Sequence, residues 1–431
     1  MVFIAALIMV SFTSSNDATV VVVGAGAAGL MAAGQAAASG AKVLVLEKMK
    51  RPGLKLCITG KGRCNLTNIA PLPDFLAHFG SSGPFLRQAF HRFFTEELLA
   101  FFQELDLAVT VERGGRIFPT SGKAIQVLQV FERWLKRLGV ELLTETAVEA
   151  LLITDGRLTG VRYQGRKIRC QALILATGGA SYPLTGSTGD GYRLAGQAGH
   201  HLVPIRPALV PLVTADPFPL SMDGLQLRNA TARLFINGKK KAETFGELTF
   251  MEFGLSGPII LTLSGRIVEA LHAGSTVTLA LDLKPALDEA KLEARLLRDL
   301  AQRHDEPMQS VLRGLLPKEL VPIALAESGS RPEQRAGDVR APERKGLRHW
   351  LKDWRLPIVD HRPLAEAIVT AGGVDTTEVN PRTMESRLVR GLYFAGEILD
   401  IQADTGGYNL QAAFSTGWLA GRSAAASITA V

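Results

Sequence analysis

The chain opens with two short β-branched runs on either side of an alanine-rich segment of helical length. Residues 19–23 form the first apolar run and end at Gly24, and residues 27–39 have the composition of a helix that stops at Gly40. A second apolar run, 42–46, ends at an acidic residue. This order predicts a strand–helix–strand unit with parallel strands.

Residues 48–203 continue the alternation of helical and strand patterns. Aromatic and leucine residues recur at helical spacing between 90 and 105 and predict a buried helix face. Residues 48–70 are rich in lysine, glycine and asparagine, which predicts a long loop of the kind that is usually functional. One more helix and four more strands are expected at 124–138, 140–144, 148–153, 158–163 and 172–176.

Around residue 204 the pattern changes to short strands and turns, then to helices, and from 364 the glycine-rich αβ pattern returns. We therefore expect an α/β protein with a Rossmann-type domain, an inserted antiparallel β-rich domain and a small helical subdomain. Residues 328–345 are expected to form an exposed loop. The expected domains are 18–203 with 364–431 for the Rossmann-type domain, 204–285 with 355–363 for the β-rich insert, and 286–354 for the helices.

Composition narrows the functional classes. Hydrophobic residues make up 47% of the 431, as in a globular protein with a well-filled core. The formal charge is +7, but no aromatic residues interleave the lysines at 239–241. They follow Asn237-Gly238, a hairpin-turn pair, so we interpret them as a solvated loop and expect no nucleic-acid partner.

The N-terminal segment and the cysteines indicate the cellular compartment in which we expect the protein. The apolar run 2–10 is too short to span a bilayer and no basic residue precedes it, so we interpret 1–8 as a start-site extension without a targeting role. Three cysteines, with no CxxC pair, are typical of a reducing compartment. We expect a cytoplasmic protein with neither a membrane partner nor a metal site, and the sequence predicts no particular oligomeric state.

A dinucleotide fingerprint follows the first strand. Residues 24–29 read G-x-G-x-x-G, and the strand, helix, second strand and Glu47 around them make the match specific. Gly24 permits the tight turn, Gly26 lets a pyrophosphate approach the backbone, and Gly29 lets helix and strand pack closely. The helix N-terminus favours the phosphates, and Glu47 is expected to accept hydrogen bonds from the adenosine ribose.

The C-terminal segment distinguishes FAD from NAD. A strand at 391–395 ends in Gly396-Glu397, and a Gly406-Gly407 turn then begins an alanine-rich helix. An acid at that place is suited to ribityl hydroxyls, and a helix N-terminus is suited to the negative charge of a reduced flavin ring. We therefore expect non-covalent FAD.

These motifs, together with several others, resemble the BaiN-like, aminoacetone oxidase-like family of FAD-dependent flavoproteins. The additional matches are TGKGRCNLTN at 59–68, GRIFP at 115–119, ATGGASYP at 176–183, GSTGDGY at 186–192 and the run 391–421. The resemblance implies a FAD domain with a β-rich insert and a small helical domain, and it implies that the 59–68 loop and the 406–411 turn lie against the flavin. One departure is Met251-Glu252, where relatives often have Thr-His.

We assign cofactor binding to one set of residues, which extends from the fingerprint to the last helix. The set is Gly24, Ala25, Gly26, Ala28, Gly29, Glu47, Lys48, Lys55, Gly60, Lys61, Gly62, Arg63, Cys64, Asn65, Val148, Thr177, Gly178, Gly179, Gly396, Glu397, Gly407, Tyr408, Asn409 and Leu410.

The leading hypothesis is a FAD-dependent oxidoreductase that transfers hydride between flavin and a small organic substrate, bound between the FAD domain and the insert. The catalytic candidates are Glu252, for proton transfer, and Tyr408. With no second fingerprint, NAD(P)H is expected at most as a transient electron donor. Two alternatives stay open: a non-catalytic redox sensor that uses Cys57 and Cys64, and a flavoenzyme that acts on RNA.

Overall fold

The computed structural model describes residues 19–429, so the interpretation of 1–8 falls outside the described residues. Its centre is a sheet of five parallel strands in the order β19–β10–β1–β2–β6. The two outermost segments of the chain thus share one sheet, and the predicted α/β class is confirmed. The strands span β1 Thr19–Val23, β2 Lys42–Leu46, β6 Glu141–Leu143, β10 Ala172–Leu175 and β19 Leu392–Phe394.

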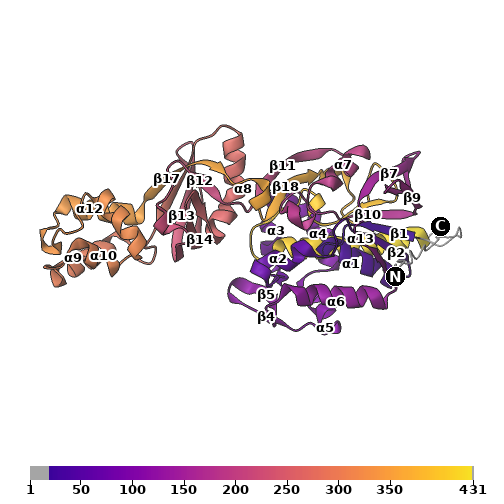
Figure 1. Ribbon diagram of the computed structural model, residues 1–431, viewed down its shortest axis with the longest axis horizontal. Helices are drawn as coiled ribbons and strands as arrows, with labels where there is room; N and C mark the ends of the chain where they lie inside the picture. The colour runs from indigo at the N-terminus through magenta and orange to yellow at the C-terminus, as the bar shows by residue number, and fades with distance from the viewer. Residues whose placement is uncertain (1–18, 430–431) are drawn as a thin grey trace, which may run out of the picture.

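The first and last helices cross at a glycine contact. Helix α1 (Ala27–Ala38) packs against α13 (Tyr408–Thr429), as Figure 1 shows beside the sheet. A Cβ at Gly417 would lie 2.4 Å from the Ala28 carbonyl oxygen, and one at Gly421 would lie 2.3 Å from that of Ala32. Real Cβ atoms do not approach backbone so closely, so both glycines are needed for this crossing.

The expected loop at 48–70 is only partly a loop. Helix α2 (Leu54–Gly62) forms within it and is kinked at Thr59, Gly60 and Lys61. The short strand β3 (Thr67–Asn68) then joins β5 (Arg116–Pro119) and β4 (Val109–Val111) in a small antiparallel sheet. This pairing joins residues about fifty positions apart, which a local hydrophobic pattern does not report.

Further elements surround the central sheet. The predicted aromatic helix face is divided between two helices, and the strands expected between 148 and 163 form a separate antiparallel sheet rather than joining the parallel one. The bounds are α3 Leu72–Ala77, α4 Gly83–Arg92, α5 Thr95–Glu104, α6 Ala124–Arg137, β7 Val148–Thr154, β8 Arg157–Tyr163, β9 Arg166–Arg169 and α7 Asp190–Gln197.

The β-rich insert closes on itself as a barrel in the order β12–β15–β14–β13–β16–β17. The Asn237-Gly238 turn joins β13 to β14 as expected, but the three lysines after it begin β14 instead of lying in a loop. Helix α8 (Pro258–His272) packs against the barrel. The strands are β12 Leu212–Thr214, β13 Gln226–Ile236, β14 Lys239–Met251, β15 Gly254–Ser256, β16 Val277–Asp282 and β17 Trp354–His361.

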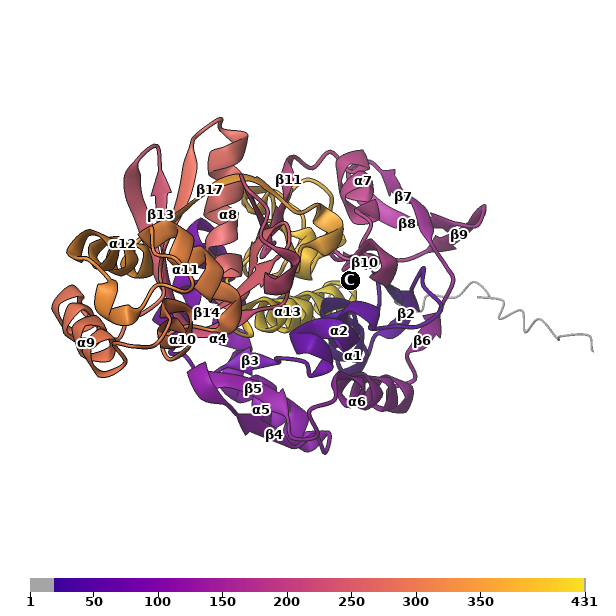
Figure 2. The same ribbon diagram turned by 60° about the vertical axis from the view of Figure 1, so that its left-hand side comes forward.

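A bundle of helices lies at the far end of the barrel, so the molecule is elongated in Figure 1, and Figure 2 shows the bundle turned toward the viewer. The apolar residues of barrel and bundle form one continuous core. The expected exposed loop at 328–345 is interrupted by α12, which starts at Ala341. We propose that barrel and bundle act as one inserted unit. The helices are α9 Glu289–Gln302, α10 Met308–Arg313, α11 Val321–Ser328 and α12 Ala341–Lys352.

Two antiparallel strands connect the insert to the sheet region. Strand β11 (Leu202–Ala208) pairs with β18 (Val369–Val374), and the Ile368 N–H donates to the Leu209 carbonyl at 3.1 Å. The chain therefore leaves for the insert and returns at neighbouring positions. Within residues 19–429, no helix is both long and apolar enough to cross a bilayer.

A buried histidine ties α7 to the segment before β19. The His200 side chain is fully buried; its Nδ1 lies 3.1 Å from Glu378 Oε2 and its Nε2 lies 2.8 Å from Ser386 Oγ. Two backbone N–H groups donate to Ser386 Oγ, which leaves the serine hydroxyl to donate to Nε2. Burial lowers the pKa of His200, against the opposing effect of Glu378.

Replacing His200 by Leu is expected to destabilise the protein by about 1–3 kcal/mol, because the partners of the ring are left unpaired in a buried place. Since the unfolded chain takes up a proton more readily than the folded one, wild-type stability should fall as the pH drops through about 6.5. The variant should lack that part of the pH dependence. Denaturant unfolding between pH 5 and 8 measures both effects. His201→Leu, at an exposed neighbour, is the control, and equal effects of the two changes would contradict the assignment.

Candidate functional site

A cavity of about 1050 Å³ lies between the carboxyl ends of the parallel strands and the barrel. Its lining comes from the turn after β1, the ends of β2, β10 and β19, the α2 loop and the N-terminus of α13. On the opposite side, β13, β14, β15 and the start of α8 contribute. Ligands of open α/β sheets bind at this edge, and the volume is at the upper end of that of cofactor and ligand sites.

Of the three glycines in the glycine-rich turn, only one borders free space in the cavity. Gly24 has φ +100°, and a Cβ there would lie 2.5 Å from the Ala176 carbonyl oxygen. A Cβ at Gly29 would lie 1.9 Å from the Gly24 carbonyl oxygen, whereas one at Gly26 would meet nothing within 4 Å. Two glycines are thus required by packing, and Gly26 borders open space in the cavity where a pyrophosphate fits.

Glu47 lines the cavity and is almost buried, at 8% exposure. Its Oε2 accepts the Ala25 N–H at 2.7 Å and its Oε1 accepts the Met49 N–H at 2.8 Å. The carboxylate therefore fixes the glycine-rich turn, in addition to the ribose role that we predicted. Each oxygen retains a lone pair for a ligand hydroxyl.

Glu47→Ala is expected to lower FAD affinity by about one to two orders of magnitude, because hydrogen bonds to charged groups contribute about 1.5–3 kcal/mol each. Isothermal titration of the FAD-free protein with FAD measures the change. Glu141→Ala, on the neighbouring strand β6, is the control. Unchanged cofactor retention in the Glu47 variant would count against this site.

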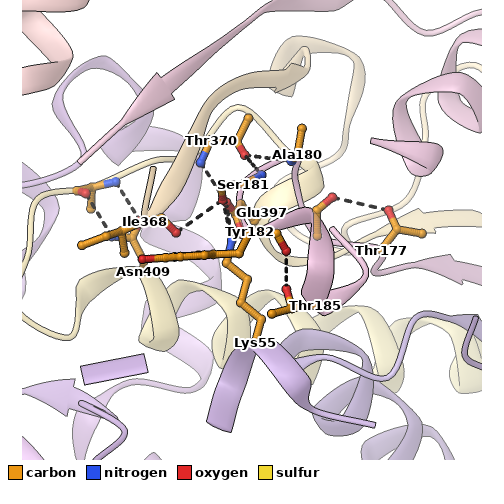
Figure 3. A network of polar contacts seen from close by, with 12 residues as sticks. Lys55, Thr177, Ala180, Ser181, Tyr182, Thr185, Ile368, Thr370, Glu397 and Asn409 are labelled. Carbon is orange, nitrogen blue, oxygen red and sulfur yellow. Dashed lines mark hydrogen bonds and ion pairs between the residues drawn. The ribbon is translucent and has the colours of Figure 1, made fainter. Parts of the chain in front are cut away.

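Four residues from four distant segments form a polar network (Figure 3), in which Lys55 and Glu397 line the cavity. Lys55 Nζ lies 2.7 Å from both Glu397 Oε2 and Ser181 Oγ. The Ser181 hydroxyl and the Thr370 N–H both donate to Glu397 Oε1, at 3.0 and 2.8 Å. Glu397, predicted to bind the ribityl chain, is thus held by a part-buried ion pair. Sequence reasoning missed Ser181 and Thr370, because only the fold brings these segments together.

The α2–β3 loop is attached to the turn that begins α13. Asn68 Nδ2 donates to the Gly406 carbonyl at 3.1 Å, and a Cβ at Gly407 would lie 2.4 Å from the Thr67 carbonyl oxygen. With its amide turned to satisfy its neighbours, Asn65 accepts the Gly407 N–H at 3.0 Å. This contact holds the N-terminus of α13 at the cavity wall, where its dipole favours an anionic group.

The two predicted catalytic residues lie in different surroundings. Tyr408 lines the cavity, but its ring is only 6% exposed and stacks on His78 at 3.9 Å. Glu252 is exposed at the turn from β14 to β15 and is not part of the cavity wall. Its proposed proton transfer has no support in this geometry, because the side chain is exposed and lies outside the cavity lining. We assign Glu252 no further role.

The remaining predicted cofactor residues fall into two groups. Ala25, Ala28, Lys48, Lys55, Gly60, Lys61, Arg63, Asn65, Val148, Thr177, Gly178, Gly396 and Leu410 all line the cavity. Gly62, Cys64 and Gly179 do not, although Gly179 packs against Thr370, where a Cβ would lie 2.3 Å from Oγ1. Asn409 also lines the cavity, but its amide is bonded to the backbone of Ala403 and Asp404.

The cysteines do not resemble redox sensors. Cys64 is fully buried, and burial raises the pKa of its thiol to about 12. The pKa of Cys57 is also raised, by burial and by Glu132. Since the thiolate is the reactive form, both thiols are poorly suited to oxidation chemistry at neutral pH.

The barrel presents a row of polar side chains to the cavity that the sequence did not reveal. Gln226 pairs with Thr249, and Thr249 pairs with Ser256, on three adjacent strands. All three residues line the cavity, opposite the 59–68 loop and the turn at Gly406–Gly407. Arg63, which stacks on Phe118 at 4.3 Å and pairs with Glu112, lies on the other wall. The arrangement provides hydrogen-bonding groups for a ligand between the two units.

One more residue of the wall is Tyr182, which the sequence analysis did not single out. Lys61, Tyr182 and Leu209 all have left-handed backbone and all line the cavity. Bulky residues rarely adopt this conformation, and such strain clusters at functional sites. Tyr182 lies within the ATGGASYP match at 176–183, but its left-handed backbone appears only in the folded chain, so the sequence analysis did not mark it as a site residue.

The comparisons with known proteins agree with this geometry. A family model described as "HI0933-like protein Rossmann domain" matches residues 18–423. The 3-dehydro-bile acid delta(4,6)-reductase of Clostridium scindens is 37% identical over 94% of this chain and 98% of its own length. The ribosomal RNA dihydrouridine synthase of Escherichia coli is 31% identical, over 92% and 96%.

Solved structures share the fold at low sequence identity. The open conformation of a flavocytochrome c3 fumarate reductase superposes with a TM-score of 0.53 at 15% identity, covering 96% of this chain and 79% of that one. A variant of the Escherichia coli quinol fumarate reductase superposes with a TM-score of 0.52 at 20% identity, covering 96% of this chain and 70% of that one.

Proposed function

Because this chain belongs to the HI0933-like Rossmann-domain family and is an FAD-dependent oxidoreductase, we propose that it reduces a carbon–carbon double bond conjugated to a carbonyl group. The substrate is a small organic molecule bound between the FAD domain and the barrel. The observation that supports this most directly is the two-sided cavity: cofactor loops form one wall, and Gln226, Thr249 and Ser256 form the other.

The choice of reaction rests on what the two relatives have in common. The name of one describes reduction of double bonds at positions 4 and 6 of a 3-dehydro-bile acid. The name of the other describes formation of dihydrouridine, in which a uracil double bond is saturated. In both cases the bond reduced is conjugated to a carbonyl, although the molecules differ greatly in size and polarity. We therefore transfer the bond type to this chain and not either substrate.

The residues present fit FAD. Open space beside Gly26 suits a pyrophosphate, and Glu47 offers lone pairs to a ribose. Gln402 also lines the cavity, and its buried Oε1 has no hydrogen-bond partner within the described part of the chain, so it can accept from a bound ligand. When bound, FAD supplies two-electron reduction at its ring. The chain carries one dinucleotide fingerprint, so we propose NADH or NADPH as a transient donor rather than a resident one.

The proposal is tested by reducing the FAD-loaded protein without oxygen and mixing it with candidate acceptors in a stopped-flow spectrometer. The acceptors are 2-cyclohexen-1-one, a 3-oxo-4-ene steroid, uridine monophosphate and a uridine-containing RNA hairpin. Flavin reoxidation by a small enone, with the saturated ketone recovered, is expected. Reoxidation by RNA alone would replace the small substrate by a nucleic acid, and a flavin that none of the four reoxidises would overturn the proposed reaction.

A further inference from the structure

The proposed reduction, on which this inference rests, consumes a proton as well as a hydride. Hydride is added to the carbon β to the carbonyl, and the α carbon must then receive a proton from an acid within the cavity. Most of the ionisable groups in the wall are already engaged. Glu47 holds two backbone N–H groups, and the carboxylates of Glu397, Asp190 and Asp404 are paired with Lys55, Lys48 and His78.

Tyr182 differs from these groups. Its side chain lines the cavity and is partly buried, and no residue in the described part of the chain forms a hydrogen bond to its phenol oxygen. Figure 3 shows its ring extending away from the Lys55–Glu397 pair. Burial, with a smaller effect of Glu366, raises the pKa of the phenol. It therefore carries its proton at neutral pH, as a donor must.

The backbone holds this ring in place. Tyr182 has φ 53° and ψ 61°, and its carbonyl accepts from the Thr185 N–H at 2.9 Å and the Thr185 hydroxyl at 2.7 Å. The preceding residue, Ser181, is fully buried and bonded to Thr370 and Glu397. An unfavourable backbone conformation is thus stabilised from both sides, which is how catalytic groups are commonly positioned.

We propose that Tyr182 is the proton donor of the reduction and that its hydroxyl protonates the carbon next to the substrate carbonyl. In this step the phenol O–H bond breaks and the α C–H bond forms, and the hydride at the β carbon would come from bound, reduced FAD. The resulting tyrosinate recovers its proton from solvent. The charged group that acts on the phenol is Glu366, which is paired with Arg362, and the Lys55–Glu397 pair is bonded to the preceding residue, Ser181.

The test uses Tyr182→Phe in the full-length FAD-loaded protein, with Tyr163→Phe as the matched control. Tyr163 ends strand β8 and is not part of the cavity wall. FAD content and chemical reduction of the flavin should be unchanged in both variants. Reoxidation of reduced flavin by 2-cyclohexen-1-one should be slower by about 100-fold or more in Tyr182→Phe, the range that a general acid contributes, and unchanged in the control.

Two further readouts separate proton donation from a structural role. The substrate for the first readout is 2-methyl-2-cyclohexen-1-one, whose α carbon becomes a stereocentre when the double bond is reduced. In D₂O, wild type should add deuterium to one face of this carbon, and Tyr182→Phe should lose that preference. The second readout is an ultraviolet titration of the tyrosines in the FAD-free protein. Wild type should show an ionisation step that Tyr182→Phe lacks, and the pH of that step should shift when 2-cyclohexen-1-one is added.

The outcomes are distinguishable. If wild type reduces the enone and Tyr182→Phe does so at the same rate, the assignment of Tyr182 is wrong and the proposed function stands. If Glu247→Gln, on the exposed edge of the barrel wall, slows the reaction and Tyr182→Phe does not, the proton comes from the barrel side. If wild type reduces no enone, the proposed function fails and this inference fails with it.

Discussion

Gly26→Ala should strongly lower FAD affinity while leaving the fold intact, whereas Gly29→Ala should damage both. A methyl group at Gly26 meets no protein atom within 4 Å and enters the cavity where the cofactor pyrophosphate is expected. The φ of Gly26 is −82°, so alanine adopts it without strain. A methyl group at Gly29 lies 1.9 Å from the Gly24 carbonyl oxygen, so α1 must move away from the turn after β1.

The variants are compared first by the free energy of unfolding of the FAD-free protein and then by their affinity for FAD. Gly26→Ala should keep the wild-type free energy of unfolding but lose FAD affinity by about 100-fold or more, since the close approach of backbone to phosphate is lost. Gly29→Ala should lose about 1–3 kcal/mol of stability, the usual cost of overpacking. Gly196→Ala on α7, where a Cβ also meets nothing within 4 Å, is the control outside the cavity. Full FAD occupancy of Gly26→Ala would contradict the placement of the pyrophosphate.

The second large effect concerns the two ends of the chain. Truncation after residue 363 should give a protein that neither folds stably nor binds FAD. It removes β19, which pairs with β10, and α13, which covers α1. It also removes Glu397 and the Gly406–Gly407 turn from the cavity. Solubility, circular dichroism and FAD content of the truncated chain measure the loss.

The matched variant removes the insert instead. Residues 210–367 are replaced by Asn-Gly, because the Ile368 N–H and the Leu209 carbonyl are already hydrogen-bonded and a two-residue turn can join β11 to β18 as a hairpin. This variant should fold and retain FAD, because Gly26, Glu47 and Glu397 remain. It should not reduce enones, because the barrel wall is gone. A truncated chain that still bound FAD normally would show that the sheet does not need its last strand.

Much of the cofactor half of the fold could be predicted from local pattern. β1 and β2 match the expected bounds, and α1 and α6 end within a residue of theirs. Each of these elements has its own short-range signal: β-branched runs, a helix with a glycine stop, and an acid at a strand end. The Asn-Gly hairpin between β13 and β14 is a signal of the same kind, since two residues alone determine the turn.

The parts that sequence reasoning missed depend on contacts between distant residues. Closure of the barrel requires β12 to pair with β15 and β17, which lie about 40 and 145 residues further along the chain. The Glu397 network joins α2, the loop after β10, strand β18 and the turn after β19 in the same way. Glu252 was selected for its chemical type beside a family motif, but the direction of a hairpin turn decides whether such a side chain reaches a cavity. Tyr182 was passed over because its importance comes from backbone geometry.

The glycine crossing of α1 and α13 has a consequence for how the protein is made. On the ribosome, residues 19–46 emerge before the insert, yet the helix that α1 needs for its buried face, and the strand beyond β10, belong to residues 392–429, which follow the insert. The barrel and bundle, whose core closes within 212–358, are complete earlier. We therefore expect the nascent chain to fold its insert while the N-terminal unit is still without its partner, and to acquire FAD only after α13 has been made.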